Sequence, residues 1–393
     1  MTPRAKGFAN GSLYLQRMNH ETLLMVADSE HDSNVLYATG MFVPDPFIYF
    51  SRNGTGYMVL NDLEIDRARK QASHCRVVSW SNCCKQLRQQ KVPRPGFAHV
   101  IRFLVKGRKW KRIVVPHNFP HGLARELARM RIKINVKAGA VFPQREVKSF
   151  AEVKKISAAL MMAEVGLAEG IQALKLSKIG KDRKLIYHNL PLTSERLRAI
   201  IDTAIVHAGG LANHTIVAGG HHGCDPHEPG FGPLRAEEPI ILDIFPRSQK
   251  TGYFGDITRT VVKGRASEAV RKLYDAVERA QETAFLHLRE SVPASEVHQK
   301  VQEFFQKEGF KTGKVGGRMQ GFFHGTGHGL GLDIHEAPRV GADTTEVLQA
   351  GHVVTVEPGL YYPSMGGVRL EDVAWITRKG ARNLTKFEKA LEI

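Results

Sequence analysis

The sequence lacks the long apolar runs that membrane-spanning segments require. No stretch of about 18 consecutive apolar residues occurs in its 393 residues, so we expect no transmembrane helix. The first residues, MTPRAKGFANGSLYLQRM, contain neither an apolar core of signal-peptide length nor a small-residue cleavage site behind one. We therefore predict a cytoplasmic protein that has no membrane partner.

Cysteine is also scarce. The four cysteines include the adjacent pair Cys83 and Cys84, and their spacing fits neither a disulfide framework nor a zinc finger. We predict that all four are reduced thiols with a structural role.

Negative charge is in short supply, because 39 Asp and Glu face 56 Lys and Arg and the formal net charge is +17. A basic excess can attract nucleic acid, anionic membranes or acidic substrates. The basic residues are scattered, with local clusters at residues 106–112 (KGRKWKR) and 178–184 (KIGKDRK), and no aromatic residues interleave as in a single-strand-binding groove. We interpret the excess as a solvated surface and do not expect nucleic acid as a partner.

The chain is long enough for two or three domains, and its composition is that of a globular protein. Alternating strand and helix patterns predict a small α/β domain over residues 1–145, with a boundary near Phe142-Pro143. We expect strands at residues 37–43, 47–50, 57–60, 75–80, 98–104 and 111–115, and a helix at 63–73.

Residues 146–393 have the pattern of a larger α+β domain with long helices and an antiparallel sheet. Ser149 and Glu152 fit a capping box before a helix at 151–174, and Thr193 or Ser194 caps a second helix that ends near 208. We expect further helices at 266–290 and 295–308, and strands at 215–218, 240–245, 258–262, 353–357 and 373–377.

Residues 324–335, HGTGHGLGLDIH, hold three histidines and four glycines in a dozen positions. Glycine lets the backbone approach a ligand closely, and histidine is both a common metal ligand and a general acid/base near neutral pH. This composition suits neither a helix nor a solvated loop, so it predicts the wall of a site. The alternative is a glycine-rich surface loop with chance histidines.

Four acidic residues lie in or beside apolar strands: Asp243 in IILDIF, Asp256 in GDITRTVV, Glu357 in VVTVEPGLY and Glu371 in VRLEDVAWIT. Carboxylates are rarely buried unless they are paired or bind a metal. Buried ion pairs with Arg259 and Arg369 are the alternative explanation. If the four carboxylates converge, two divalent cations balance their charge and leave room for one hydroxide.

Oxygen-rich ligation with a single imidazole favours Mn²⁺, Fe²⁺ or Co²⁺ over an all-thiolate zinc site. Two metals about 3.5–4 Å apart lower the pKa of a bridging water and clamp a tetrahedral intermediate. Hydrolysis is therefore the expected chemistry.

These segments resemble those of the pita-bread metallopeptidases, which include aminopeptidase P, prolidase and methionine aminopeptidase, with creatinase as a metal-free relative of the same fold. The matching segments run from Asp243 to Glu371, and the helices before them also fit, so the resemblance covers about residues 150–393. Residues 1–145 look like the smaller N-terminal domain of the aminopeptidase P, prolidase and creatinase branch, which methionine aminopeptidases lack. The resemblance implies a pita-bread catalytic domain over residues 146–393.

The resemblance also implies a role for each residue of the site. Asp243 resembles a terminal ligand of the first metal, Asp256 and Glu371 the two bridging carboxylates, and His328 the imidazole ligand of the second metal. Glu357 resembles a ligand of that metal and the group that accepts the proton. His335 matches a histidine that stabilises the tetrahedral intermediate, His324 one that lines the substrate pocket, and His227 an upstream histidine for which His221 and His222 compete. Arg369 resembles an arginine that supports Glu371.

The sequence departs from the family pattern in two places. The two aspartates lie 13 positions apart, a longer interval than the family usually has, and the extra residues fall in PRSQKTGYFG. The segment before Asp243, HHGCDPHEPGFGPLRAEEP, is rich in His, Gly and Pro. We expect both segments at the rim of the pocket, where they bear on the substrate more than on the metals.

The resemblance therefore implies a hydrolase with two metal ions, Mn²⁺ first and Co²⁺, Fe²⁺ or Zn²⁺ as alternatives. Its expected substrate is a peptide with proline near the N-terminus, cleaved as by an Xaa-Pro aminopeptidase or dipeptidase, and the expected assembly is a homodimer. The proposed reaction is attack of a metal-bridging hydroxide on the scissile carbonyl. A metal-dependent lyase or non-peptide hydrolase on the same fold, and a non-enzymatic nucleic-acid-binding relative, stay open as alternatives.

Overall fold

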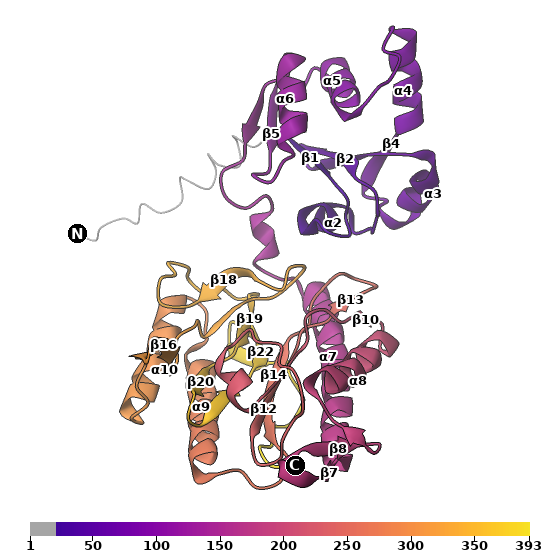
Figure 1. Ribbon diagram of the computed structural model, residues 1–393. Coiled ribbons are helices and arrows are strands. Elements are labelled where there is room, and N and C mark those ends of the chain that lie inside the picture. The colour runs from indigo at the N-terminus through magenta and orange to yellow at the C-terminus, as the bar shows by residue number, and fades with distance from the viewer. Residues whose placement is uncertain (1–20) are drawn as a thin grey trace, which may run out of the picture. The chain divides into compact units, whose positions relative to one another are not determined.

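The computed structural model describes residues 21–393, so the expectation about the start of the chain concerns residues outside the described ones. The chain divides into two compact units, Met1–Pro143 and Gln144–Ile393 (Figure 1). Among residues 21–393, no helix combines the length and the apolar character needed to cross a bilayer.

The first unit is built on a six-stranded mixed sheet with the order β4-β3-β2-β1-β5-β6. Adjacent strands β1, β2 and β3 pair antiparallel, and the outer pairs are parallel. The strands are β1 (Glu21–Ala27), β2 (Phe47–Arg52), β3 (Thr55–Leu60), β4 (Cys75–Ser79), β5 (Arg112–Val115) and β6 (Ile134–Val136), and the helices are α2 (Ser33–Thr39), α3 (Asp62–Gln71), α4 (Trp80–Gln89), α5 (Phe97–Gly107) and α6 (His121–Arg129).

Each face of this sheet has its own apolar core. Side chains from α4, α5 and α6, such as Leu87, Ile101 and Leu127, pack on one face. Side chains from α2 and α3, such as Val35 and Ala68, pack on the other. The unit therefore has three layers, with the sheet between two groups of helices (Figure 1).

Two of the strands expected in this unit are wrong. Residues 98–104 lie in helix α5, whose buried positions Ala98, Ile101, Leu104 and Val105 follow the three- and four-residue spacing of a helix. Residues 37–43 overlap the end of helix α2 and the segment behind it. Asp32 caps α2 by accepting a 2.9 Å hydrogen bond from the Val35 N–H, and this local signal outweighs the strand propensity of the apolar residues.

The second unit contains four long helices, whose starts match the capping signals in the sequence. Ser149 and Glu152 form the expected capping box before α7, and Thr193 accepts from the Arg196 N–H at the start of α8. The helices are α7 (Phe150–Leu176), α8 (Ser194–His207), α9 (Glu268–His287) and α10 (Ala294–Lys307), with short 3₁₀ turns η1 (Pro143–Arg145), η2 (Lys181–Arg183) and η3 (Gly220–Cys224).

Two antiparallel sheets lie between the helix pairs α7–α8 and α9–α10 (Figure 1). Their orders are β11-β12-β14 and β18-β17-β19-β22-β23, and a bridge between Thr258 and Glu371 connects them. The main strands are β11 (Ile216–Gly219), β12 (Pro239–Ile244), β14 (Ile257–Val262), β17 (Gly327–Gly329), β18 (Glu336–Val340), β19 (Val353–Val356), β22 (Asp372–Thr377) and β23 (Gly380–Asn383).

The remaining strands of this unit form small sheets around the central ones. They are β7 (Lys178–Ile179), β8 (Leu185–Tyr187), β9 (Leu190–Pro191), β10 (Gly210–Leu211), β13 (Arg247–Ser248), β15 (Gly313–Val315), β16 (Arg318–Gln320), β20 (Gly359–Tyr362) and β21 (Gly366–Arg369). The long helices and antiparallel sheets confirm the α+β architecture expected for this part of the chain.

Candidate metal centre

The four acidic residues singled out in the sequence lie at the ends or within the strands of the two central sheets. Asp243 is part of β12, and Asp256 directly precedes β14, which pairs with β12. Glu357 directly follows β19 and Glu371 directly precedes β22, its partner strand. The Glu371 N–H donates to the Thr258 carbonyl at 3.0 Å, which fixes one sheet against the other at this point.

His328 is the middle residue of β17, and glycines on both sides let this strand lie close to its neighbours. A Cβ atom on Gly327 would lie 1.9 Å from the Thr355 carbonyl oxygen, and one on Gly329 would lie 2.3 Å from the Ala337 oxygen. Any larger residue at either position would displace the strand that carries His328. The glycines of HGTGHGLGLDIH therefore act by permitting close backbone approach, as the sequence indicated.

Asp256, His328 and Glu371 form a compact group, with one potential ligand atom from each lying within 4.8 Å of the others. The other two predicted ligands lie beside it. The His328 Nε2 is 3.8 Å from Asp256 Oδ2 and 3.4 Å from Glu357 Oε1. Asp243 is bound by Arg369, whose Nη2 lies 2.7 Å from Asp243 Oδ2. All five residues line one cavity.

Two threonine hydroxyls orient the carboxylates. The Thr258 Oγ1 donates to Glu371 Oε2 at 2.8 Å. The Thr355 Oγ1 accepts from the His328 N–H at 3.1 Å and donates to Glu357 Oε1 at 3.3 Å. The same hydroxyl thus connects the histidine to the nearest carboxylate.

Burial and the mutual repulsion of the carboxylates shift the pKa values of this group. Burial, together with the nearby acidic groups, raises the pKa of Asp256 and of Glu371 well above the ordinary values. Burial raises the pKa of Glu357 to about 7, although Arg369 opposes the shift. Burial lowers the pKa of His328 to about 3, so the imidazole is neutral at pH 7 and its ring nitrogens can bind a metal.

This donor set fits divalent cations. It places several carboxylates and a neutral imidazole in a buried space. Among residues 21–393, the only guanidinium that contacts the side chain of a predicted ligand is that of Arg369, which pairs with Asp243. Without cations the carboxylates must take up protons, whereas two divalent ions would match their charge.

Arg369 is nearly fully buried and contacts more than the sequence suggested. Its guanidinium donates to Asp243, to the Tyr361 hydroxyl at 3.0 Å and to the Pro226 carbonyl at 3.3 Å. Its contact toward Glu371 is indirect, through a 3.5 Å Nε contact with the Thr258 hydroxyl. Arg369 therefore reaches Glu371 only through Thr258, and its direct acidic partner is Asp243.

The three remaining predicted residues, His227, His324 and His335, also line the cavity. The His335 ring stands perpendicular to the His328 ring with centroids 4.4 Å apart. His324 Nε2 lies 2.9 Å from the Tyr361 hydroxyl. Burial lowers the pKa of His335 and lowers that of His324 to about 3, so both rings are neutral at pH 7.

The structure distinguishes His227 from its two competitors. His227 lines the cavity, whereas the His221 and His222 rings contact each other with centroids 4.2 Å apart, and His222 packs on Phe231. The order of histidines along the chain could not show this, because the 3₁₀ turn η3 redirects the backbone between them.

The cavity has a volume of about 1300 Å³ and includes residues that the sequence did not single out. Phe322, Phe323 and Met319 supply apolar surface, and Arg339, four residues after His335, adds an exposed cation. Tyr361, which links His324 to Arg369, was also missed. The only available signal for it was its position four residues after Glu357 in a buried strand.

The longer interval between the two aspartates forms a structured loop. Its Arg247 and Ser248 make strand β13, which pairs with β10, and the Tyr253 hydroxyl donates to Glu152 on α7 at 2.9 Å. Between the two aspartates, only Phe245 is part of the cavity wall. Most of this loop thus packs against α7 and β10, away from the rim where we expected it.

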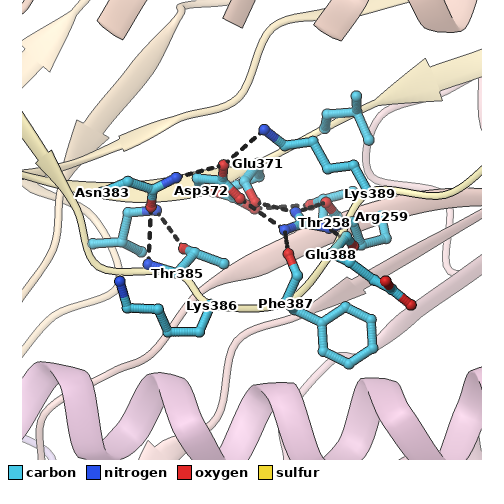
Figure 2. A network of polar contacts seen from close by, with 12 residues as sticks. Thr258, Arg259, Glu371, Asp372, Asn383, Thr385, Lys386, Phe387, Glu388 and Lys389 are labelled. Carbon is cyan, nitrogen blue, oxygen red and sulfur yellow. Dashed lines mark hydrogen bonds and ion pairs between the residues drawn. The ribbon is translucent and has the colours of Figure 1, made fainter. Parts of the chain in front are cut away.

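A second buried network lies directly behind Glu371 (Figure 2). Arg259 donates from all five N–H groups: to the Asp372 carboxylate at 2.8 Å and to the carbonyls of Glu371, Thr258, Phe387 and Glu388 at 2.7 to 3.1 Å. Asp372 also accepts from Asn383 and pairs with Lys389 at 3.1 Å. Arg259 therefore holds the backbone of Glu371, and its charge partner is Asp372 rather than any predicted metal ligand.

Comparison with known proteins agrees with this geometry. The model of metallopeptidase family M24 matches residues 153–378, more than half of the chain. An Xaa-Pro dipeptidase of Pyrococcus furiosus is 37% identical over 178 residues, which cover 45% of this chain and 48% of that protein. An Xaa-Pro dipeptidase of Pyrococcus horikoshii is 28% identical over 287 residues, covering 72% and 75%. The chain thus matches about half the length of the first relative and three quarters of the second.

A solved structure shows that the fold extends over both units. The X-Pro aminopeptidase from Thermotoga maritima MSB8 superposes with a TM-score of 0.80 at 22% identity, covering 96% of this chain and 99% of that one. Together with the cavity geometry, these matches confirm the resemblance and the pita-bread architecture expected from the sequence. The chain belongs to metallopeptidase family M24.

Proposed function

We propose that this protein is a metal-dependent exopeptidase that hydrolyses peptides with proline next to the scissile bond, as an Xaa-Pro dipeptidase or Xaa-Pro aminopeptidase. The observation that carries the proposal is the group of buried carboxylates around a neutral His328 in the wall of a large cavity. Membership of family M24 and the similarity to two Xaa-Pro dipeptidases support the choice of substrate.

Five residues would hold two divalent ions: Asp243, Asp256, His328, Glu357 and Glu371. Four carboxylates and one imidazole favour Mn²⁺, with Co²⁺, Fe²⁺ or Zn²⁺ as alternatives. When bound, the metals would supply Lewis acidity, which makes water a stronger nucleophile and stabilises charge on a carbonyl oxygen.

We assign the proton transfers of the reaction to Glu357. Its carboxylate lies in the cavity wall beside His328, and its pKa is raised toward neutrality by burial. A carboxylate in this position accepts a proton from the attacking water and delivers it to the amine that leaves, which is general base catalysis followed by general acid catalysis. The Thr355 hydroxyl holds one Glu357 oxygen and leaves the other available.

The three histidines of the cavity would contact the substrate. His335 is neutral, exposed to the cavity and close to His328, so its N–H is placed to donate to the oxygen on which negative charge develops. His324 is held by Tyr361 and forms part of the pocket wall, and His227 lines the same wall. Phe322 and Phe323 offer apolar surface suited to a proline ring.

Three further proposals extend the expectations drawn from the sequence. We assign residues 1–145 to a creatinase- and prolidase-like N-terminal domain and residues 146–393 to the catalytic domain. We also propose a homodimer, which light scattering coupled to gel filtration would test, and a cytoplasmic location, which fractionation of the source cells would test.

Metal content and cleavage, measured together, test the proposal. Protein purified without chelator is analysed by mass spectrometry for metal, then assayed with Ala-Pro-Ala and Ala-Pro after addition of Mn²⁺. We expect near two metals per chain and cleavage of one of the two peptides, which separates aminopeptidase from dipeptidase. Metal binding without cleavage would support the metal site but refute the proposed substrate, and would favour a lyase or a non-peptide hydrolase. Failure to bind metal would refute the mechanism.

Two variants separate the site from the rest of the cavity. Glu357→Gln should lower kcat by roughly 10²–10⁴-fold, the usual contribution of a general base. Asp343→Asn is the matched control, because Asp343 is an exposed acid of the same cavity that is not among the proposed ligands. It should leave both metal content and kcat unchanged.

A further inference from the structure

The positive charge of the protein is concentrated in one part of the N-terminal unit. Residues 76–137 contain sixteen Lys and Arg but a single acidic residue, Glu126, which gives this stretch a formal charge of +15 out of +17 for the whole chain. The rest of the sequence is therefore nearly neutral. Of the two basic clusters noted in the sequence, residues 106–112 lie in this stretch and residues 178–184 lie outside it.

The fold places most of these cations in one layer. Helices α4, α5 and α6 pack on the same face of the six-stranded sheet. Six of the cations lie on these helices and most of the others lie in the segments that connect them. Arg76 and Arg112 lie on strands β4 and β5 of the sheet itself. We call all sixteen cations together the basic layer: Arg76, Lys85, Arg88, Lys91, Arg94, Arg102, Lys106, Arg108, Lys109, Lys111, Arg112, Arg125, Arg129, Arg131, Lys133 and Lys137.

The cations of the basic layer have no counterions within the fold. All except Lys137 are exposed, and no salt bridge joins any of the sixteen to an acidic residue among residues 21–393. The opposite layer differs, because on α3 Arg67 pairs with Glu64 and Arg69 pairs with Asp66. A field of unpaired like charges destabilises the unit by self-repulsion, so folding stability does not explain it.

The shape of the layer favours one class of polyanion. A membrane surface would need apolar anchors, and a single strand would need exposed aromatic rings on which bases stack. Among residues 21–143 the large hydrophobic side chains that are exposed are Leu63, which lies on α3, and Val136, and neither is aromatic. A duplex needs neither feature, because its phosphates carry one charge per about 1.7 Å of helix axis.

We propose that the basic layer binds the phosphate backbone of double-stranded nucleic acid without sequence preference. The basic layer shares no residue with the metal centre, and the proposal does not depend on the peptidase function. It revises the expectation, drawn from composition, that the basic excess is only a solvated surface. DNA and RNA duplexes share the phosphodiester chemistry, so the experiment compares them.

The test is fluorescence anisotropy of the full-length protein with labelled 24-base-pair DNA and RNA duplexes at increasing KCl. If about six cations contact phosphates, the slope of log K against log salt is about −5, and affinity falls roughly 10³-fold between 50 and 200 mM KCl. Tighter binding of one duplex than the other would identify the physiological source. Absence of duplex binding at 50 mM KCl would overturn the proposal, as would binding that occurs only to phosphatidylserine vesicles.

Two triple variants with the same charge change locate the site. Arg88→Glu, Arg102→Glu and Arg129→Glu alter one exposed residue on each of α4, α5 and α6, whereas Arg67→Glu, Arg69→Glu and Lys70→Glu alter α3 on the opposite layer. Both lower the net charge from +17 to +11. We expect the first to weaken duplex binding at least tenfold at 50 mM KCl and to flatten the slope by about 3, and the second to change binding much less.

Equal losses from both triple variants would show a general charge effect and overturn the assignment to the basic layer. Circular dichroism establishes that each variant is folded, and replacement of the same three arginines by glutamine gives a milder version of the test. Peptide cleavage and metal content should be unchanged in all variants, because none of the altered residues lies in the cavity.

Discussion

Replacing Arg259 with methionine should be among the most damaging single substitutions in the second unit, Gln144–Ile393, which we call the catalytic unit because it contains the proposed active site. The Arg259 guanidinium is 1% exposed and makes an ion pair with Asp372, whose side chain is equally buried. Methionine removes the charge and all five donated hydrogen bonds but keeps most of the volume. Four backbone carbonyls and one carboxylate then lose a partner, although Asp372 keeps Lys389 and Asn383.

The expected loss is about 3–5 kcal/mol, the usual result when one partner of a buried ion pair is removed. The reason is the desolvation penalty of the group left behind, which exceeds the net contribution of the contact itself. Because Arg259 also holds the Glu371 carbonyl at 2.7 Å, the variant should bind metal more weakly even where it is folded.

Urea unfolding followed by tryptophan fluorescence measures this loss. The chain has three tryptophans, of which Trp375 lies in β22 next to the network, while Trp80 and Trp110 belong to the first unit. Replacing those two with phenylalanine makes the signal specific for the catalytic unit. Arg271→Met is the matched control, since Arg271 pairs with Glu392 at a surface where both side chains are at least a third exposed. It should cost no more than about 1 kcal/mol.

A double-mutant cycle with Asp372→Asn completes the test. If the two residues act as a pair, the coupling energy between them is about 0.5–3 kcal/mol. The reasoning fails if Arg259→Met costs as little as Arg271→Met, or if metal retention is unaffected in protein shown to be folded.

Three other outcomes follow from features of the fold. Gly327→Ala should destabilise the catalytic unit and reduce metal content, because the added Cβ would lie 1.9 Å from the Thr355 carbonyl; a normal metal content by mass spectrometry would contradict this. All four cysteines are buried and the pKa of each thiol is raised by burial. Native protein should therefore react slowly with a thiol reagent at pH 8, whereas four thiols should react in denaturant. Fast reaction of the folded protein would contradict the buried placement of the cysteines. Burial, aided by Lys148, lowers the pKa of His352 to about 4, below the unfolded value of about 6.5. The unfolded chain therefore binds more protons in this window, and the part of the stability due to neutral His352 is lost as pH falls from about 6.5 to 4; His352→Gln should remove that part of the slope, and identical slopes would refute the assignment.

The sequence predicts the catalytic unit better than the first unit, for physical reasons. Helices α7 and α8 carry side-chain caps, Ser149 and Thr193, that act within three residues and are visible in the sequence. Helix α5 has a glycine N-cap with no side-chain hydrogen bond, and its run FAHVIRFLV is apolar enough to resemble a buried strand. Helices α7 and α8 were thus predicted where a side-chain cap marks the start, and α5 was missed where none does, whereas α2 was missed despite its Asp32 cap.

The candidate site shows the same division. The ligand types could be recognised because a carboxylate inside an apolar strand is unusual wherever its partners lie. The partners themselves could not, because Arg369 reaches Asp243 over 126 positions and Arg259 reaches Asp372 over 113. Both arginines and their acidic partners lie in or beside apolar strands, so the sequence around them looks alike. Only the register of the sheets decides which guanidinium contacts which carboxylate. Tyr361 was missed for the same reason.

The network behind Glu371 also sets an order of events during synthesis of the chain. Arg259 emerges from the ribosome 128 residues before Phe387 and 129 before Glu388, whose carbonyls complete its hydrogen bonds. At about 5–20 residues per second this interval is roughly 6–26 seconds. During that time the guanidinium must stay hydrated, and the backbone at Glu371, once it has been made, lacks the finished network behind it. A nascent chain therefore cannot complete the network behind Glu371 until Phe387 and Glu388 have been made.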